Sequence, residues 1–461
     1  MMTNEPLRSP ASFRDPSGFI WEKEGKIFRQ VNVAYKDHYD LIMSSGLFTR
    51  LTENKLLVKH VEVLPNTADP ACYKVLQPEP IPFISYPYEW CFSQLQDAAL
   101  ATLEIQKEAL HHGMTLKDAS AYNIQFLEGK PILIDTLSFE EYEAGAPWIA
   151  YQQFCQHFLA PLALLALTDI HLGTLSQVHL DGIPLNLAAK LLPTRARFSF
   201  GLGIHLFLHA RSQEKHAANA QKQTLVLPKH QLLGIIESLI TTVRRLRPPK
   251  QKTVWGTYYQ NTNYTAPGLK DKESIIQRWV SELHPESVWD MGANDGHFGR
   301  LASKQGIPTI ASDFDPLAIE HAYAQMKKEQ DGSILPLVIN VTNPSPSIGW
   351  MNKERESFLH RASFDLTLCL ALLHHITITN NVPFSLMSSL LARQTKMLII
   401  EFVPREDSNT QRLLAHHSND FPDYERPIFE QTFSDHFEIL KQVRVKESTR
   451  ILYLMKRKET K

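Results

Sequence analysis

The sequence predicts an α/β protein whose C-terminal half forms a doubly wound, Rossmann-like sheet with an antiparallel last strand. Residues 286–316 have the pattern strand, glycine-rich turn, helix, strand, and Asp313 ends the second strand. Strand-like and helical segments then alternate, and two strand-like runs close the chain. In the first half, short strand patterns precede helical stretches, which predicts an α+β N-terminal domain.

The length of 461 residues predicts two or three domains. We expect an α+β N-terminal region at 1–150, a helical region at 151–247 that belongs to the same domain, and the doubly wound domain at 253–461. Between them, residues 244–252 (RRLRPPKQK) are basic and broken by proline. This composition favours a solvated interdomain linker over a nucleic-acid or phosphate patch.

Charge and cysteine usage exclude several classes of protein. The formal net charge of −1 gives no electrostatic case for nucleic acid or an anionic membrane. Four scattered cysteines have no metal or disulfide spacing, which favours a reducing compartment. The N-terminus lacks the apolar core of a signal peptide, and the longest apolar run, 158–167, is about half of the roughly 20 residues that a membrane helix needs. We therefore expect a cytoplasmic protein of undetermined oligomeric state.

The first half contains several strand patterns and one clear helix. Residues 18–34 predict a hairpin, and 60–63 and 73–75 are further strand candidates. Residues 93–112 predict a helix, because their apolar side chains recur on one stripe and Gly113 follows.

Three polar residues follow this helix at a notable spacing. Asp118 and Asn123 are five positions apart, and Asp135 ends a short apolar strand after an intervening hairpin. The arrangement resembles the catalytic loop and metal-binding aspartate of the protein-kinase-like and aminoglycoside-phosphotransferase-like superfamily. The resemblance implies that Asp118 orients a hydroxyl nucleophile, while Asn123 and Asp135 hold Mg²⁺ on ATP.

The match to the kinase-like pattern is incomplete. No glycine-rich phosphate loop is visible near residues 18–34, Leu116-Lys117 replaces the usual His-Arg, and Thr136-Leu137 stands where Phe-Gly is common. No lysine can be singled out as the one that pairs with ATP, although Lys55 and Lys59 are available. Alternatively, the three polar residues simply cap turns and end a strand. We expect a kinase-like fold without efficient phosphotransfer.

Two histidines in the helical region have the spacing of metal ligands. His205 and His209 are four positions apart, which places them on one helix face. With no third ligand evident nearby, we expect packed core histidines, and no metal site is predicted.

The glycine-rich turn of 286–316 carries the most specific motif. A dinucleotide fingerprint would require glycines where Asn294 and His297 stand. Asp290-x-Gly292-x-Asn294-x-Gly296 instead resembles motif I of the class I S-adenosylmethionine-dependent methyltransferases, usually Asp/Glu-x-Gly-x-Gly-x-Gly. Asparagine tolerates left-handed backbone, so the turn survives its substitution for glycine. The alternative is an ordinary glycine turn in another α/β domain.

The resemblance implies S-adenosylmethionine as cofactor, and it implies roles for these residues. Asp290, Gly292, Asn294 and Gly296 would surround it, Asp313 would bind the ribose hydroxyls, and a third strand at 334–339 would place Asn340 near the adenine.

Further candidates surround the expected methyl group. A fourth strand, beginning at 364, is followed by His374 and His375, which are candidate general bases for a hydroxyl acceptor unless they only pack or cap a turn. A fifth strand, 396–402, carries Glu401 near its carboxyl end as a candidate substrate residue. In members of this family, the segment before motif I often folds over the cofactor cleft and contributes to the acceptor pocket. The resemblance implies this role for Tyr258, Tyr259 and Tyr264. The alternative is that these tyrosines only pack on the surface. Residues 437–445 and 449–455 predict the closing antiparallel pair.

The methyltransferase resemblance covers about residues 253–456. The whole chain, including FRDPSGFIWEKEGKIFRQ and ISYPYEW, also resembles bacterial two-part methyltransferases, some of them nodulation-protein-like. The function it implies is methyl transfer to an unidentified acceptor, with a small molecule or glycan favoured and the first half holding or presenting it. The alternatives are a catalytically silent cofactor-binding or regulatory protein, and phosphotransferase activity in the N-terminal half.

Overall fold

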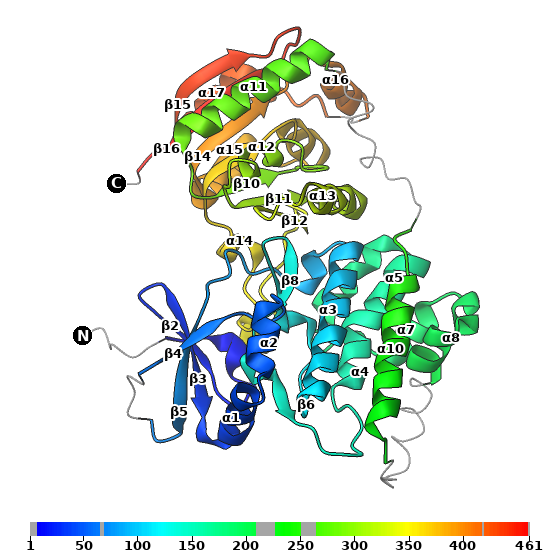
Figure 1. The fold of residues 1–461 in the computed structure, drawn as a ribbon. Coiled ribbons are helices and arrows are strands. Elements are labelled where there is room, and N and C mark those ends of the chain that lie inside the picture. The colour runs from blue at the N-terminus through cyan, green and yellow to red at the C-terminus, as the bar shows by residue number, and fades with distance from the viewer. Residues whose placement is uncertain (1–6, 65–68, 209–225, 250–263, 417–418, 460–461) are drawn as a thin grey trace. The chain divides into compact units, whose positions relative to one another are not determined.

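The computed structural model describes the chain except for residues 1–6, 65–68, 209–225, 250–263, 417–418 and 460–461. The chain forms two compact units (Figure 1). The first consists of Met1–Lys250 and Ser347–Glu356, and the second of Gln251–Pro346 and Ser357–Lys461. The segment Ser347–Glu356, which the sequence placed in the C-terminal domain, is therefore part of the first unit.

The first unit begins with a five-stranded sheet in the order β1-β2-β3-β5-β4, in which all neighbours are antiparallel. The predicted hairpin of residues 18–34 is the β2–β3 pair, and the predicted strands near 60 and 73 are confirmed. The bounds are β1 Leu7–Arg8, β2 Ile20–Lys23, β3 Lys26–Asn32, β4 His60–Val63 and β5 Cys72–Pro78.

The rest of the first unit is mainly helical and is built around α3, which confirms the helix predicted at 93–112. Its apolar stripe of Leu95, Ala99 and Leu103 is buried. Two short antiparallel pairs, β6–β9 and β7–β8, complete the unit. The helices are α1 Lys36–Ser44, α2 Leu47–Glu53, α3 Phe92–His111, α4 Tyr151–Phe154, α5 Ala160–Leu167, α6 Leu175–Val178, α7 Leu185–Leu191, α8 Phe200–Leu202 and α10 Lys229–Arg245; the strands are β6 Met114–Leu116, β7 Ile124–Leu127, β8 Lys130–Leu133 and β9 Phe139–Glu141.

The second unit contains a seven-stranded sheet in the order β12-β11-β10-β13-β14-β16-β15. The first five strands in this order are parallel, and β16 runs antiparallel to both of its neighbours. The predicted doubly wound sheet with an antiparallel closing pair is confirmed. The bounds are β10 Val288–Met291, β11 Thr309–Asp313, β12 Ile334–Val338, β13 Phe364–Cys369, β14 Thr395–Phe402, β15 Phe437–Arg444 and β16 Ile451–Arg457.

Helices cover both faces of this sheet. On one face, Ile276 and Trp279 of α11 pack with the sheet residues Leu368 and Ile399 in a buried apolar core. On the other face, side chains of α15 and α17 form an aromatic cluster with Phe402 of β14. Alternate residues of a strand point to opposite faces, so Ile399 and Phe402 belong to different faces. The helices are α11 Ala266–Leu283, α12 Gly299–Ser303, α13 Pro316–Glu329, α14 Phe358–Arg361, α15 Phe384–Gln394, α16 Ser408–Ala415 and α17 Arg426–Ser434.

Among the helices that the structure describes, none combines the length and apolar character that crossing a bilayer requires.

Candidate functional site

The second unit contains a cavity of about 410 Å³ at the carboxyl ends of its parallel strands. It lies where β10, β11, β12 and β13 give way to loops. Predicted site residues on its wall are Tyr264, Asp290, Gly292, Asn294, Asp313, Asn340 and His375; other lining residues include Leu269, Lys272, Phe298, Phe314, Thr342, Leu372, Ile376, Thr379, Asn380 and Leu413.

The turn after β10 has the backbone that its sequence requires. Gly292, Asn294 and Gly296 have φ angles of 71°, 52° and 77°. These values lie in the left-handed region, which glycine adopts freely and asparagine tolerates. A Cβ on Gly292 would lie 2.9 Å from Leu372 Cδ1, so a side chain there would also collide with Leu372, which lines the cavity. Gly296 is not among the lining residues.

Two buried aspartates hold the loops around the cavity. The Asp290 carboxylate accepts a hydrogen bond from Gly299 N at 2.7 Å. The Asp313 carboxylate accepts from Asn294 N and from Asp315 N, each at 2.9 Å. Burial raises the pKa of Asp290 to about 7 and that of Asp313 to about 6, although these backbone donors oppose the shift. A carboxylate has about four acceptor positions, so both groups can accept further hydrogen bonds from a ligand.

The two adjacent histidines differ in their access to the cavity. His375 lines it, whereas His374 is fully buried and is absent from its wall. The two rings lie 4.1 Å apart between centroids. Burial, followed by the charges of Arg412 and Arg450, lowers the pKa of His375 to about 4, so its imidazole is neutral near pH 7. Burial also lowers the pKa of His374 far below its ordinary value. Only His375 is placed to touch a ligand in the cavity.

The carboxylate of Glu401 is engaged by protein groups. Lys272 Nζ donates to its Oε2 at 2.7 Å, and the Tyr264 hydroxyl donates to its Oε1. Burial works to raise the pKa of Glu401, but the charges of Lys272 and Arg450 outweigh it and hold that pKa below the ordinary value. Glu401 does not line the cavity, in contrast to the substrate contact that the sequence predicted. Its observed contacts hold Lys272 and Tyr264, which do line it.

The other tyrosines named from the sequence, Tyr258 and Tyr259, lie outside the described residues. Asn340 lines the cavity, and its side-chain oxygen accepts from Thr342 N at 3.0 Å and from the Thr342 hydroxyl at 2.7 Å. These two hydrogen bonds hold the loop after β12 in a turn whose residues 340–342 line the cavity.

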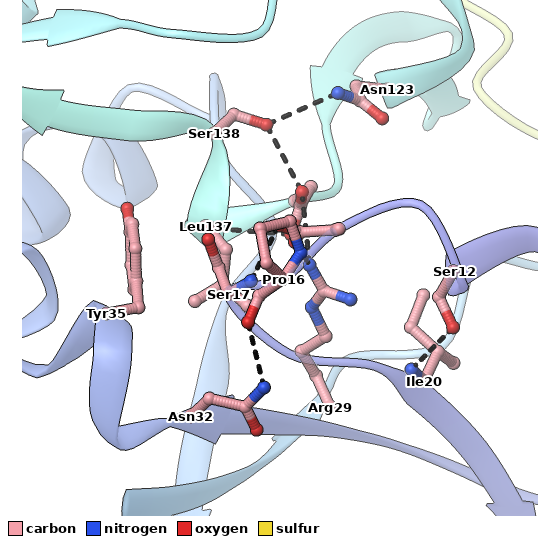
Figure 2. A network of polar contacts seen from close by, with 12 residues as sticks. Ser12, Pro16, Ser17, Ile20, Arg29, Asn32, Tyr35, Asn123, Leu137 and Ser138 are labelled. Carbon is pink, nitrogen blue, oxygen red and sulfur yellow. Dashed lines mark hydrogen bonds and ion pairs between the residues drawn. The ribbon is translucent and has the colours of Figure 1, made fainter. Parts of the chain in front are cut away.

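In the first unit, two of the three kinase-like candidates are joined through one serine (Figure 2). Asn123 Nδ2 donates to the Ser138 hydroxyl at 3.3 Å, and this hydroxyl donates to Asp135 Oδ2, also at 3.3 Å. Arg29 of β3 is paired with Asp135 at 3.3 Å and with Asp15. Arg29 is 8% exposed, so its charge is neutralised within the unit.

Asp118 makes different contacts. Its Oδ1 accepts from Ser120 N at 2.9 Å and from Gln153 Nε2 at 2.8 Å. The Asp118 side chain therefore does not take part in the Ser138 hydroxyl bridge, although the Asp118 backbone N donates to Ser138 O at 3.4 Å. The described part of the chain contains no cluster of three or more His, Cys, Asp or Glu residues suited to a metal ion.

The structure shows a contact for one of the two lysines that the sequence offered for ATP pairing. Lys55 Nζ pairs with the exposed carboxylate of Glu128 at 2.5 Å. In kinase-like folds the cation that pairs with ATP stands on the third strand of the sheet. Here the third strand, β3, carries Arg29.

His205 is a packed core histidine. Its ring nitrogens contact the Tyr151 hydroxyl and Ser238 Oγ, each at 2.8 Å, and the residue is 2% exposed. His209 lies outside the described residues.

The relation to known proteins rests on one full-length match. Over 464 residues the chain is 33% identical to nodulation protein NoeA of Rhizobium meliloti (strain 1021), and the match spans 98% of this chain and 97% of NoeA. The chain belongs to the NoeA family. The predicted resemblance of the whole chain to nodulation-protein-like proteins is thus confirmed. No protein-family model matches it.

Solved structures give weaker likenesses. The bifunctional kinase-methyltransferase WbdD is 18% identical, with a TM-score of 0.30 over 43% of this chain and 42% of WbdD. N-methyltransferase NodS of Bradyrhizobium japonicum WM9, in complex with S-adenosyl-L-homocysteine, is 13% identical, with a TM-score of 0.32 over 42% of this chain and 89% of NodS. Magnesium protoporphyrin IX methyltransferase (ChlM) of Synechocystis PCC 6803, with bound SAH, gives 13% identity and a TM-score of 0.31 over 41% of this chain and 84% of that one.

Two functional candidates escaped sequence reasoning. Lys272 occupies a position on the apolar stripe of α11, between Leu269 and Ile276, and a lysine on such a stripe signals a buried charge that needs a partner. The indication for Arg29 in the sequence was weaker. It is a single cation among the apolar residues of its predicted strand.

Proposed function

We propose that the second unit binds S-adenosylmethionine in the cavity and transfers its methyl group to a hydroxyl of an acceptor. The observation that carries this proposal is the convergence of the Gly292 turn, the Asp313 carboxylate and His375 on one cavity wall. These three come from the loops after β10, β11 and β13, which is where a doubly wound sheet binds ligands.

The residues present fit the cofactor. Gly292 leaves room in a turn that any Cβ would fill, and its neighbours Ala293 and Asn294 also line the cavity. Asp313 would accept hydrogen bonds from the ribose hydroxyls, and Asn340 would lie near the adenine. When bound, S-adenosylmethionine supplies a methyl group activated by the sulfonium to which it is attached.

His375 is the group best placed to act on the acceptor. A neutral imidazole can accept the proton of a hydroxyl as that hydroxyl attacks the methyl carbon. The low pKa of His375 makes it a weak base, so we assign it mainly to orienting the hydroxyl and receiving its proton late. Most of the rate would come from holding donor and acceptor in line and close together.

The acceptor is proposed only as a class. A small molecule or glycan hydroxyl fits a wall on which Thr379 and Asn380 offer neutral polar groups next to His375. The acids on the same wall, Asp290 and Asp313, are already bound to backbone amides of the cofactor loops.

Calorimetric titration of the full chain with S-adenosylmethionine tests the proposal. Asp313→Ala should lower the affinity about tenfold or more, because a hydrogen bond to a charged group contributes about 1.5–3 kcal/mol. A folded wild-type chain that shows no binding would reject the methyltransferase assignment. Binding without transfer of labelled methyl to glycan and small-molecule fractions of a bacterial extract would favour a regulatory cofactor-binding protein instead.

For the first unit we propose a kinase-like fold that does not transfer phosphate efficiently and that holds or presents the acceptor. The supporting observation is that Arg29, the cation on the third strand, is paired with both Asp15 and Asp135. A guanidinium engaged in this way is a poor partner for the phosphates of ATP, which carry much of the binding in active relatives.

A further inference from the structure

The segment Ser347–Glu356 belongs to the first unit, although the chain on both sides of it belongs to the second. On its N-terminal side, Asn340, Val341 and Thr342 line the cavity only a few residues earlier. On its C-terminal side, Phe358 N donates to Ser345 O at 2.9 Å. This hydrogen bond joins the two ends of the segment, which we call the base of the excursion; residues 347–356 are the excursion, and its middle part is the tip. The covalent path from the cavity wall into the first unit is therefore short.

The C-terminal base of the excursion is also packed beside the cofactor loops. Phe358 is fully buried, and its ring meets that of Trp289 edge-on at 5.4 Å between centroids. Trp289 directly precedes Asp290, which lines the cavity. Both ends of the excursion are thus attached to residues that a ligand in the cavity would touch or adjoin.

Within the first unit, the tip of the segment is fixed in a defined conformation. Ile348 and Arg355 form an antiparallel bridge. Gly349 has a φ of 84°, and a Cβ there would lie 2.6 Å from Glu354 Cβ, so the turn requires glycine. Ile348 packs against a cluster of buried tyrosines, and the Arg355 guanidinium lies 4.6 Å from the ring centre of Tyr122. The tip is therefore a packed element.

Glu354 connects this tip to the loop between β1 and β2, residues 9–19. It is 4% exposed, and its Oε1 accepts from Arg14 Nε at 3.0 Å and lies 2.9 Å from Arg14 Nη2. The next residue, Asp15, pairs with Arg29, which pairs with Asp135. Further along the loop, the Ser17 hydroxyl accepts from Lys117 Nζ at 2.6 Å.

We propose that the segment Ser347–Glu356 couples occupancy of the cavity in the second unit to the position of the residue 9–19 loop in the first unit. The proposal rests on the proposed function in one respect, the identity of the cavity's ligand. A ligand that orders residues 340–342 would restrict the base of the excursion, and the tip would pass this restriction through Glu354 to Arg14. The proposal rests on the short covalent connection between residues 342 and 348 and on the packed, hydrogen-bonded contacts at each end of it.

Coupling of this kind is reciprocal. A change in the residue 9–19 loop should therefore affect the cavity, just as a ligand in the cavity should affect the loop. The consequence for the protein is that the first unit would respond to the presence of the methyl donor. The network around Asp135 would be held more firmly when the cavity is filled and would loosen when the cavity is empty.

Hydrogen–deuterium exchange on the full chain, with and without saturating S-adenosyl-L-homocysteine, tests the proposal. In the wild type, the ligand should slow exchange in peptides covering residues 9–20 by about fivefold or more, the lower end of typical coupling between sites. Glu354→Gln should bind the ligand with unchanged affinity by calorimetry but lose the slowing in residues 9–20. Lys353→Gln, an exposed change of one charge in the same segment, should behave like the wild type.

Two results would overturn the coupling, and each differs from failure of the proposed function. A wild-type chain that binds the ligand but leaves exchange in residues 9–20 unchanged has no such coupling. If calorimetry shows no binding at all, the proposed function fails. The coupling is then tested by comparing hydrogen–deuterium exchange of the wild type and Glu354→Gln without ligand. Glu354→Gln must then alter exchange at residues 339–342 relative to the wild type, and unchanged exchange there would remove the proposal.

Discussion

Lys272 Nζ lies 2.7 Å from Glu401 Oε2, and the two side chains are 2% and 0% exposed. The contact joins α11 to the carboxyl end of β14. Because Tyr264 donates to the other oxygen of Glu401, one carboxylate fixes two residues of the cavity wall. This ion pair therefore contributes both to the stability of the second unit and to the shape of its cavity.

Removing one partner of the pair should be strongly destabilising. Lys272→Met removes the cation that is hydrogen-bonded to the buried carboxylate of Glu401 and leaves only the charge of Arg450 near it, and breaking a buried pair in this way typically costs about 3–5 kcal/mol. Urea denaturation of the full chain should show this loss, whereas Lys270→Met, at an exposed position of the same helix, should change stability by less than about 0.5 kcal/mol. The double variant Lys272→Met with Glu401→Gln should recover part of the loss. A double variant as unstable as the sum of both singles would show that the two residues act independently.

Gly292→Val should abolish binding of S-adenosylmethionine while the chain stays folded. Valine at this position is strained by the φ of 71°, and its Cβ would lie 2.9 Å from Leu372 Cδ1 within the cavity. Gly306→Val is the matched control, because Gly306 has a similar φ of 79° but a Cβ there would meet no atom within 4 Å. Calorimetry should find wild-type affinity for the control. Equal affinity in both variants would place the cofactor elsewhere.

Cofactor affinity should rise with pH from about 5 to about 8. The pKa of Asp313 is raised to about 6 and that of Asp290 to about 7, chiefly by burial, so both acids hold protons at the lower end of this range. Ribose hydroxyls and the cationic groups of S-adenosylmethionine favour the ionised forms, and each proton that must be released changes affinity by up to about tenfold per pH unit. Titrations of Asp313→Asn should lack the step near the lower pKa. A flat profile in the wild type would contradict these contacts.

The same two acids should affect stability with the opposite sign. A carboxyl whose pKa is raised in the folded state stabilises that state fully below its unfolded pKa, about 3.9 for aspartate. That contribution is lost as pH rises through the folded values of about 6 and about 7. In the absence of ligand, the contribution of Asp290 and Asp313 to the free energy of unfolding therefore falls over the range in which affinity increases.

His375→Ala should lower turnover much more than cofactor affinity. Because His375 is a weak base that mainly orients the hydroxyl and receives its proton late, we expect a loss of about 10²-fold in rate, the lower end of the range for general bases. His374→Ala is the informative comparison: His374 is fully buried and does not line the cavity, so its loss should reduce stability rather than the turnover of folded protein. Transfer of labelled methyl to an extract fraction that the wild type modifies provides the measurement. Wild-type turnover in His375→Ala would end its assignment as the base.

The first unit should not turn over Mg-ATP at a rate above background. Arg29 is occupied by Asp15 and Asp135, and the Asp118 side chain is bound to Gln153. Phosphate release by the full chain should therefore be the same in the wild type and in Asp135→Ala. Rapid ATP turnover that Asp135→Ala abolishes would instead identify the unit as a working phosphotransferase.

Local patterns were sufficient to predict the elements of the second unit. The turn of Gly292 and Asn294, the strand that ends at Asp313 and the closing antiparallel pair all follow from spacing and alternation within short windows. The position of β16 between β14 and β15 was not predicted in detail, because strand neighbours are chosen by packing across the whole sheet.

The unpredicted features all depend on contacts between residues far apart in the sequence. Glu401 looked like a free acid at a strand end, but its partner Lys272 lies 129 positions earlier in the chain. Arg29 meets Asp135 across 106 positions, and Arg14 meets Glu354 across 340. A local pattern can mark a residue as buried or charged, but it does not identify the partner that neutralises it.

The excursion of Ser347–Glu356 bears on how a gene for such a protein can change. A break in the reading frame after residue 250 would separate the first unit from its own Glu354 and Arg355, leaving the Arg14 guanidinium and the Tyr122 ring without those neighbours. Replacing the second half by recombination with another doubly wound domain would have the same effect unless the incoming gene supplied a matching insertion between its third and fourth strands. We therefore expect the two halves to be inherited together.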